Sequence, residues 1–288
     1  MTVWTERTTI AERVTLAGHG LHSGDAVQMN LCPAPPGTGI VFRVDGAAGA
    51  GEVPATLASL ADGRNATTLE SRGVRVTTVE HLLAALAMTR VDDVRIDLDA
   101  GEPPAVDGSA EPFVRLIEAA GRRRHGAARR VAEILVPLAL CEGAKEISIE
   151  PCSALAVDYE IDFDAPVIGR QSLVLEPLDR ATFAREIAPA RTFGFLADVE
   201  RMRAAGLARG ASLANTVVVD GSGVVNPDGL RWPDEFVRHK LLDLVGDLAL
   251  FGMPLRGRIR VRRGGHALHH ALLRRLVATP GAWRAVEC

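Results

Sequence analysis

Three side chains able to bind a metal ion or carry a proton recur in the segment EFVRHKLLDLVGD, residues 235–247. His239, Asp243 and Asp247 stand at i, i+4 and i+8, so they lie on one face of a helix. Burying such groups is expensive unless they are paired or bound to a metal. The face is therefore either turned to solvent or a site. A separate apolar stripe consists of Val237, Leu241, Leu244, Leu248 and Phe251.

The ends of this helix are also marked in the sequence. Asp234, after Pro233, is a plausible capping residue for the free amides of the first turn. Gly252, followed by Pro254, predicts the stop. A histidine and a carboxylate one turn apart can bind the same metal ion, but a catalytic zinc usually has three protein ligands. A third ligand is therefore expected from another segment.

The segment TTVEHLLAAL, residues 77–86, offers that ligand in His81, directly after Glu80. A structural alternative is that Thr77 and Glu80 form a capping box. A lone histidine is also more often a satisfied polar residue than a ligand. Taken together, the two segments predict a split Zn²⁺ site, in which Glu80 would take a proton from the metal-activated water. Its ligands would be His81, His239 and Asp243.

The segment RRGGHALHHALLRRL supplies candidate acids in His266, His269 and His270. Hydrolysis of an amide requires protonation of the leaving nitrogen, which suits a histidine kept cationic by an acidic neighbour. Asp247, one turn beyond Asp243, is placed to orient such an imidazole. Spacing alone does not choose among the three histidines, because two of them can simply be exposed helix residues.

Lysine is scarce in this chain. Only Lys145 and Lys240 are lysines among 33 basic residues, and Lys240 lies inside the helix described above. A composition that otherwise prefers Arg suggests that a compact ammonium is wanted at residue 240, rather than a planar guanidinium.

These segments belong to two stretches of the chain in which the expected helices and strands follow one another in a similar order. Helix, strand, turn-rich loop and helix follow one another in residues 77–120, and helix, strand, glycine pair and helix in residues 235–277. Alternating apolar residues in the strands and helical spacing elsewhere support this assignment. The basic stretch AAGRRRHGAARR, residues 119–130, is expected to be a solvated linker rather than a surface for anions. Two domains, each a sheet covered by helices, would follow.

The stretch 190–215 holds a short amphipathic helix, with Phe195, Leu196, Val199 and Met202 at helical spacings. These residues either pack on the hydrophobic core or form an apolar wall for a ligand. The stretch alone favours packing on the core.

Composition excludes several classes of protein. A net charge of −3 gives no sign of a nucleic-acid partner. No apolar stretch approaches the roughly 20 residues that span a bilayer, and the start MTVWTERTT lacks the pattern of a signal peptide. The four cysteines show no CxxC spacing. We expect a reduced, cytoplasmic protein.

Six segments in order give the chain a specific resemblance: GHGLHSG, TTVEHLLAAL, EPPAVDGSAEPF, ARTFGF, GLRWPDEFVRHKLLDLVGDL and GGHAL. They resemble the zinc-dependent UDP-3-O-acyl-N-acetylglucosamine deacetylases of lipid A biosynthesis. The resemblance assigns His81, His239 and Asp243 to zinc and makes Glu80 the general base. It implies that His266 is the general acid with Asp247 as its charge partner, that Thr192 donates to the developing oxyanion, and that Lys240 contacts substrate.

The resemblance also implies a fold of class α+β, with two α/β sandwich domains and the active-site helices packed between the sheets. The domains would span residues 1–126 and 127–288. The stretch 190–215 would then form a passage for the acyl chain, and Phe163 and Lys145 would lie near the uridine diphosphate. The residues expected in the passage are Phe193, Phe195, Leu196, Val199, Met202 and Leu207.

The expected reaction is hydrolysis of the 2-acetamido group of UDP-3-O-(3-hydroxyacyl)-N-acetylglucosamine, giving acetate and the free amine. One Zn²⁺ is the expected cofactor, although Fe²⁺ can occupy similar sites, and we expect a monomer. His19 and Ala66 depart from residues often found in the family, apolar and cysteine respectively, without removing a catalytic group. The alternatives are a zinc amidohydrolase acting on another N-acyl sugar and a protein whose zinc is structural.

Overall fold

The computed structural model describes residues 5–46, 49–61 and 65–288, with side chains left undescribed at 46–50. Part of the segment on which the signal-peptide prediction depends, residues 1–4, lies outside these ranges. A five-stranded sheet in the first part has the order β2-β3-β8-β4-β5, and β4 and β8 run parallel. Its strands are β2 (Val14–His19), β3 (Ala26–Pro33), β4 (Ile40–Gly46), β5 (Gly49–Pro54) and β8 (Val94–Leu98).

A seven-stranded sheet forms the second part, with a path β11-β12-β17-β10-β18 and with β13 and β14 joined through β17. β17 has the sequence LRGRIRVR, in which apolar residues and glycine face the core and each arginine faces outward, as expected for a strand with one covered face. The strands are β10 (Arg130–Ile134), β11 (Leu138–Glu142), β12 (Lys145–Glu150), β13 (Leu155–Asp162), β14 (Arg170–Leu175), β17 (Leu255–Arg262) and β18 (Trp283–Glu287).

Three two-stranded sheets complete the strands of the described residues. They pair β1 (Glu6–Ile10) with β9 (Arg122–Ala128), β6 (Leu69–Ser71) with β7 (Val74–Val76), and β15 (Phe193–Phe195) with β16 (Val217–Val219). Short 3₁₀ turns lie at Leu57–Ser59, Leu196–Asp198 and Ala249–Phe251, and a π turn at Phe183–Ile187. The α-helices are α1 (Glu80–Met88), α2 (Glu111–Ala120), α3 (Arg180–Thr182), α4 (Val199–Ala204), α5 (Glu235–Leu248) and α6 (His266–Val277).

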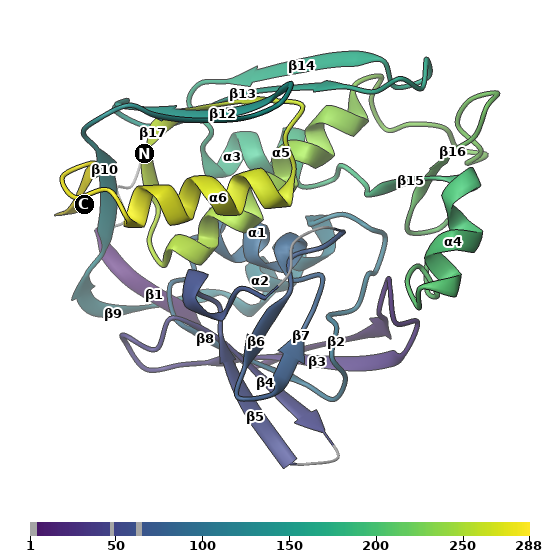
Figure 1. The fold of residues 1–288 in the computed structure, drawn as a ribbon. Helices are drawn as coiled ribbons and strands as arrows, with labels where there is room; N and C mark the ends of the chain where they lie inside the picture. Colours follow the sequence, from purple (N-terminus) through teal and green to yellow (C-terminus); the bar gives the residue numbers. More distant parts are fainter. Residues whose placement is uncertain (1–4, 47–48, 62–64) are drawn as a thin grey trace.

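Helices α1, α2, α5 and α6 lie between the two large sheets, whereas α4, β15 and β16 project to one side (Figure 1). α1 and α5 are in extensive contact. Gly246 of α5 permits this crossing, because a Cβ there would lie 2.1 Å from the backbone oxygen of Glu80. The Glu80–His81 turn is thereby brought against the middle of α5.

A continuous apolar core surrounds these helices and reaches both large sheets. Leu82, Leu83 and Leu86 of α1 and Leu241 and Leu244 of α5 have no exposed surface. Both helices are therefore central elements, and polar side chains on them are removed from bulk water.

Three local predictions are wrong. Residues 122–128 form strand β9 instead of a solvated linker. α1 begins at Glu80 without a side-chain cap, and Thr77 instead contacts the Thr68 hydroxyl, so no capping box forms. The Asp234 side chain accepts from Arg238 Nε instead of capping α5. The stop at Gly252 is confirmed, since its φ of 80° is left-handed.

Among the described residues, none of the helices has the length and apolar character that crossing a membrane requires.

Candidate active site

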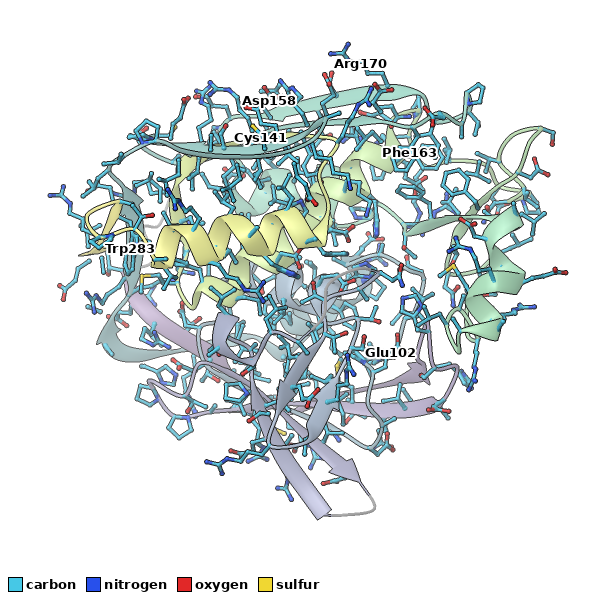
Figure 2. All side chains as sticks on the ribbon, viewed as in Figure 1. Glu102, Cys141, Asp158, Phe163, Arg170 and Trp283 are labelled. Carbon is cyan, nitrogen blue, oxygen red and sulfur yellow. The ribbon has the colours of Figure 1, made fainter. Side chains whose placement is uncertain are left out.

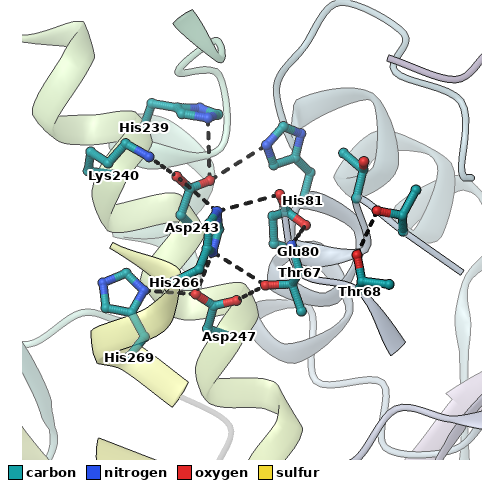
Figure 3. Close-up of polar contacts among 12 residues, drawn as sticks. Thr67, Thr68, Glu80, His81, His239, Lys240, Asp243, Asp247, His266 and His269 are labelled. Carbon is teal, nitrogen blue, oxygen red and sulfur yellow. Dashed lines mark hydrogen bonds and ion pairs between the residues drawn. The ribbon is translucent and has the colours of Figure 1, made fainter. Parts of the chain in front are cut away.

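The predicted metal ligands from α1 and α5 meet between these helices (Figure 3). His239 Nε2 lies 3.3 Å from Asp243 Oδ1, and His81 Nε2 lies 3.6 Å from the same oxygen. One candidate ligand atom from each of the three residues lies within 4.8 Å of the others. All three side chains are buried. The sequence-predicted set is thus brought together from segments more than 150 residues apart.

The ring of His239 is oriented by the backbone. Its Nδ1 lies 3.0 Å from the carbonyl oxygen of Ala190. A carbonyl only accepts hydrogen bonds, so Nδ1 carries the proton and Nε2 keeps its lone pair. Burial lowers the pKa of His239 to about 4, against the opposing attraction of Asp243, so the imidazole is neutral at pH 7. A neutral ring with a free Nε2 is the form that binds metal.

Asp243 is shared between the imidazoles and Lys240. Lys240 Nζ donates to Asp243 Oδ2 at 2.7 Å, while Oδ1 faces the two histidines. Burial alone would raise the pKa of Asp243, but Lys240 and His239 outweigh burial and hold the pKa well below its usual range. Burial likewise disfavours the Lys240 ammonium, yet Asp243 raises its pKa. Lys240 therefore has a structural partner besides the substrate contact predicted for it.

Glu80 opens α1 on the other side of the cluster and is only 3% exposed. Its Oε2 accepts from the backbone N–H of Thr67 at 3.1 Å, and its Oε1 lies 3.7 Å from His266 Nε2. Burial raises the pKa of Glu80, against the attraction of His266. A carboxylate with a raised pKa and a free oxygen is suited to accepting a proton near neutral pH.

Asp247 contacts all three histidines of α6. Its Oδ2 accepts from His266 Nδ1 at 2.7 Å and from His269 Nδ1 at 2.8 Å, and its Oδ1 lies 3.1 Å from His270 Nε2. The Thr67 hydroxyl also donates to Oδ1. Burial opposes a charged His266, but Asp247 overcomes it and raises the His266 pKa to about 9. His266 is thus the one of the three that combines a cationic state with proximity to Glu80.

His269 and His270 are buried, not exposed as the sequence allowed. The second nitrogen of His269, Nε2, lies 3.0 Å from the Tyr159 hydroxyl on β13. Burial lowers the pKa of His269 despite Asp247, and it raises that of Tyr159 well above the usual value. Tyr159 therefore donates and His269 is neutral. Neither Tyr159 nor Thr67 was predicted, because each comes from a segment without a recognisable motif.

The predicted residues of the stretch 190–215 lie in two places. Phe193 stacks edge-on against Phe236 and His239, and Lys240 Nζ lies 5.6 Å from its ring centre, so Phe193 adjoins the cluster. Phe195, Leu196 and Val199 line a pocket of about 670 Å³ with Arg203 and Val219. The ring of Phe163 contacts both Phe193 and Phe195.

The remaining candidate residues differ in their burial and in their contacts. Met202 and Leu207 are half-buried, and the Leu207 amide donates to the Met202 carbonyl. Lys145 is exposed at the start of β12. The Thr192 backbone bonds Gly108 and Val217, and its methyl group faces Gly108. His19 is exposed, whereas Ala66 is buried next to Thr67.

Comparison with known proteins assigns the chain to a family. The profile of the UDP-3-O-acyl N-acetylglycosamine deacetylases matches residues 7–278. The chain belongs to this family.

Relatives in three genera agree with the assignment. The UDP-3-O-acyl-N-acetylglucosamine deacetylase of Myxococcus xanthus is 48% identical over 278 residues, covering 96% of this chain and 88% of the relative. The enzyme of the same name from Anaeromyxobacter sp. is 47% identical over 288 residues, covering 100% and 93%. That of Pseudomonas entomophila is 42% identical over 279 residues, covering 96% and 92%.

Proposed function

We propose that the cluster between α1, α5 and α6 is the active site of a zinc-dependent deacetylase. The chain, as a member of the family, removes the acetyl group from UDP-3-O-acyl-N-acetylglucosamine, an amide hydrolysis of lipid A biosynthesis. The observation that supports this site most strongly is that three candidate ligands, His81, His239 and Asp243, lie beside two groups suited to proton transfer. These groups are the Glu80 carboxylate, whose pKa is raised, and the cationic His266 imidazole.

The donor set fits Zn²⁺. Two imidazole nitrogens and one carboxylate oxygen are ligands that zinc accepts, and three protein ligands leave a position for water or substrate. The buried carboxylates Glu80, Asp243 and Asp247 outnumber the cations Lys240 and His266 by one, a deficit that a dication would offset. When bound, zinc would lower the pKa of water and polarise the acetamide carbonyl.

The residues of the chain would then divide the proton transfers. Glu80 accepts the proton of the attacking water through the oxygen that Thr67 leaves free. His266, held by Asp247 through Nδ1, directs Nε2 toward the site and would give its own Nε2 proton to the departing amine. Thr192 would donate to the oxyanion, and Lys240, beside Phe193, would contact the substrate.

We further propose that the chain is a monomer of two α/β sandwich domains, residues 1–126 and 127–288, working in the cytoplasm. Phe195, Leu196 and Val199, which line the side pocket, would contact the acyl chain, with Phe193, Met202 and Leu207 nearby. Phe163 and Lys145 would lie toward the uridine diphosphate. An acyl chain held in this pocket would position the amide for attack.

The test is acetate release from UDP-3-O-acyl-N-acetylglucosamine substrates with C10 to C16 chains, compared with UDP-N-acetylglucosamine lacking the acyl chain. We expect turnover of the acylated substrates and a kcat/KM at least tenfold lower without the chain. Preferred hydrolysis of a different N-acyl sugar would refute the substrate assignment while leaving the metal site open to its own test.

A further inference from the structure

A second buried charge cluster lies one turn before His239. Glu235 in the first turn of α5 has no exposed surface, and Arg191 is 8% exposed. Arg191 Nε donates to Glu235 Oε1 at 2.9 Å and Nη2 to Oε2 at 3.0 Å, a two-pronged pair. The two carboxylate oxygens also accept from the backbone N–H groups of Arg191 and Arg231 at 3.0 and 2.6 Å. The Glu235 carboxylate is therefore fully bonded and fixed in place.

This pair anchors the backbone on which the His239 ring depends. Because Arg191 bonds Glu235 through both its side chain and its own amide, residue 191 is bound to the helix that carries His239. Arg191 Nη2 also donates to the Gly229 carbonyl at 2.8 Å, which adds a third attachment. The preceding residue, Ala190, presents the carbonyl that accepts from His239 Nδ1. A shift of the 190–191 peptide would remove this acceptor.

We propose that the Arg191–Glu235 pair is a positioning clamp that sets the tautomer of His239. By holding the Ala190 carbonyl against Nδ1, the clamp keeps the proton on that nitrogen and leaves Nε2 open toward Asp243 Oδ1, 3.3 Å away. Neither clamp residue belongs to the proposed metal and proton-transfer set. The inference rests on the proposed zinc ligands only where the effect of the clamp on zinc affinity is concerned.

Two variants weaken the clamp in different ways, and a third serves as control. Glu235→Gln keeps the size of the side chain but removes the charge, and Arg191→Lys keeps the charge but removes the two-pronged geometry. Glu186→Gln is the matched control, because Glu186 also pairs with an arginine of α5, Arg238 at 2.9 Å, and its other partner is Arg185 instead of the 190–191 backbone. Circular dichroism and thermal midpoints establish which variants are folded.

The measurement is a long-range ¹H–¹⁵N spectrum of the histidine rings in the metal-free protein at pH 7, with His239 assigned from His239→Ala. Zinc affinity is then measured by competition with a chelator. The wild type should show Nδ1–H for His239. Glu235→Gln should show a mixture of tautomers and bind zinc about 10–100-fold more weakly, the usual effect of losing an outer-sphere partner. Arg191→Lys should change both readouts in the same direction by less, and Glu186→Gln should match wild type.

Folded clamp variants with the wild-type tautomer and a zinc Kd within twofold of wild type would overturn the clamp. So would a wild-type spectrum with the proton on Nε2, which decides the question even where the variants do not fold. If His239→Ala instead binds zinc as tightly as wild type, the metal set fails while the tautomer result still judges the clamp.

Discussion

Charged residues gather in two regions of this molecule, between the helices and on the outer face of the seven-stranded sheet. On the outer face, arginines of β17 alternate with carboxylates of neighbouring strands. Arg262 forms two bonds to Asp158 at 2.9 and 3.0 Å, and Arg260 reaches Glu150 at 2.8 Å. Figure 2 shows Asp158 and Arg170 on this outer side. The Arg262 and Asp158 side chains are partly exposed, so their pair contributes little, about 0–1 kcal/mol.

In the proposed active site carboxylates are buried, the cations are Lys240 and His266 instead of arginines, and these cations are fewer than the carboxylates. Glu80, Asp243 and Asp247 are each at most 3% exposed. The neighbouring imidazoles of His239 and His269 are neutral, because burial lowers their pKa values. Burial raises the pKa of Glu80 and lowers that of His239. Charged neighbours outweigh burial at the other two groups, raising the pKa of His266 and lowering that of Asp243. The environment of a carboxylate, rather than its residue type, therefore separates the ion-pair lattice from the proposed active site.

The sharpest contrast should come from neutralising one glutamate in each region. Glu80→Gln cannot accept a proton, and we expect kcat to fall by about 10²–10⁴, the usual scale for general acid–base catalysis. Metal content and folding should be preserved, since no capping box depends on Glu80. Glu150→Gln on the outer face should leave kcat within twofold. Steady-state kinetics and metal analysis of both proteins check this, and turnover retained by Glu80→Gln would remove it as the base.

Asp247→Asn should change the pH dependence. The His266 pKa of about 9 lies above the ordinary 6.5 because of Asp247, so the cationic acid persists below about pH 9 and is lost as pH rises through that value. A bound dication lowers this pKa, which puts the basic limb of the pH–rate curve at or below pH 9.

Removing the Asp247 charge should move the basic limb toward pH 6.5, and complete loss of the pKa shift corresponds to roughly 3–4 kcal/mol of differential stabilisation. The same pKa shift means that the His266–Asp247 pair contributes its full share of folding stability below pH 6.5. This contribution declines as pH rises toward 9. Asp158→Asn is the outer-face control and should leave the limb in place. A basic limb unaffected by Asp247→Asn would show that His266 does not set it.

Gly246→Ala tests how the buried region is assembled. The new Cβ would lie 2.1 Å from the Glu80 backbone oxygen, which must shift together with α1. We expect a loss of about 1–3 kcal/mol in unfolding free energy, typical of overpacking, with reduced kcat because Glu80 moves. Gly221→Ala, at a position where a Cβ meets nothing within 4 Å, is the control. Urea unfolding measures both, and an unchanged Gly246→Ala protein would mean that the helices are not held this closely.

The smallest effect is expected on the outer face itself. Arg262→Gln breaks the bonds to Asp158 but leaves both groups accessible to water. The unfolding free energy should fall by at most about 1 kcal/mol, and by less at high salt. A loss of several kcal/mol in urea unfolding at 0.15 M salt would show that the lattice stabilises the fold more than exposed pairs normally do.

Sequence patterns predicted the parts of the site that repeat along one helix. The i, i+4, i+8 spacing gave His239, Asp243 and Asp247, and the structure brings His81 to them. Periodicity cannot report contacts between distant segments, which is why Thr67 and Tyr159 were missed. Nor did it reveal that Gly246 controls the helix crossing.

The wrong predictions have a similar origin. Composition suggested a linker at residues 119–130, but pairing with β1 makes residues 122–128 a strand. The three histidines of α6 look alike in sequence, and only the position of α5 beside α6 brings them all to Asp247.

The proposed function depends above all on His81, His239 and Asp243 holding one catalytic zinc ion. The most direct measurement is a zinc titration of chelator-treated protein in which bound metal and deacetylase activity are recorded at each addition. Activity should be absent without metal and return in proportion to bound zinc, reaching its maximum at one equivalent, whereas His239→Ala should require far more zinc. Full activity in protein with verified absence of metal, or unchanged stoichiometric binding in His239→Ala, would contradict the account.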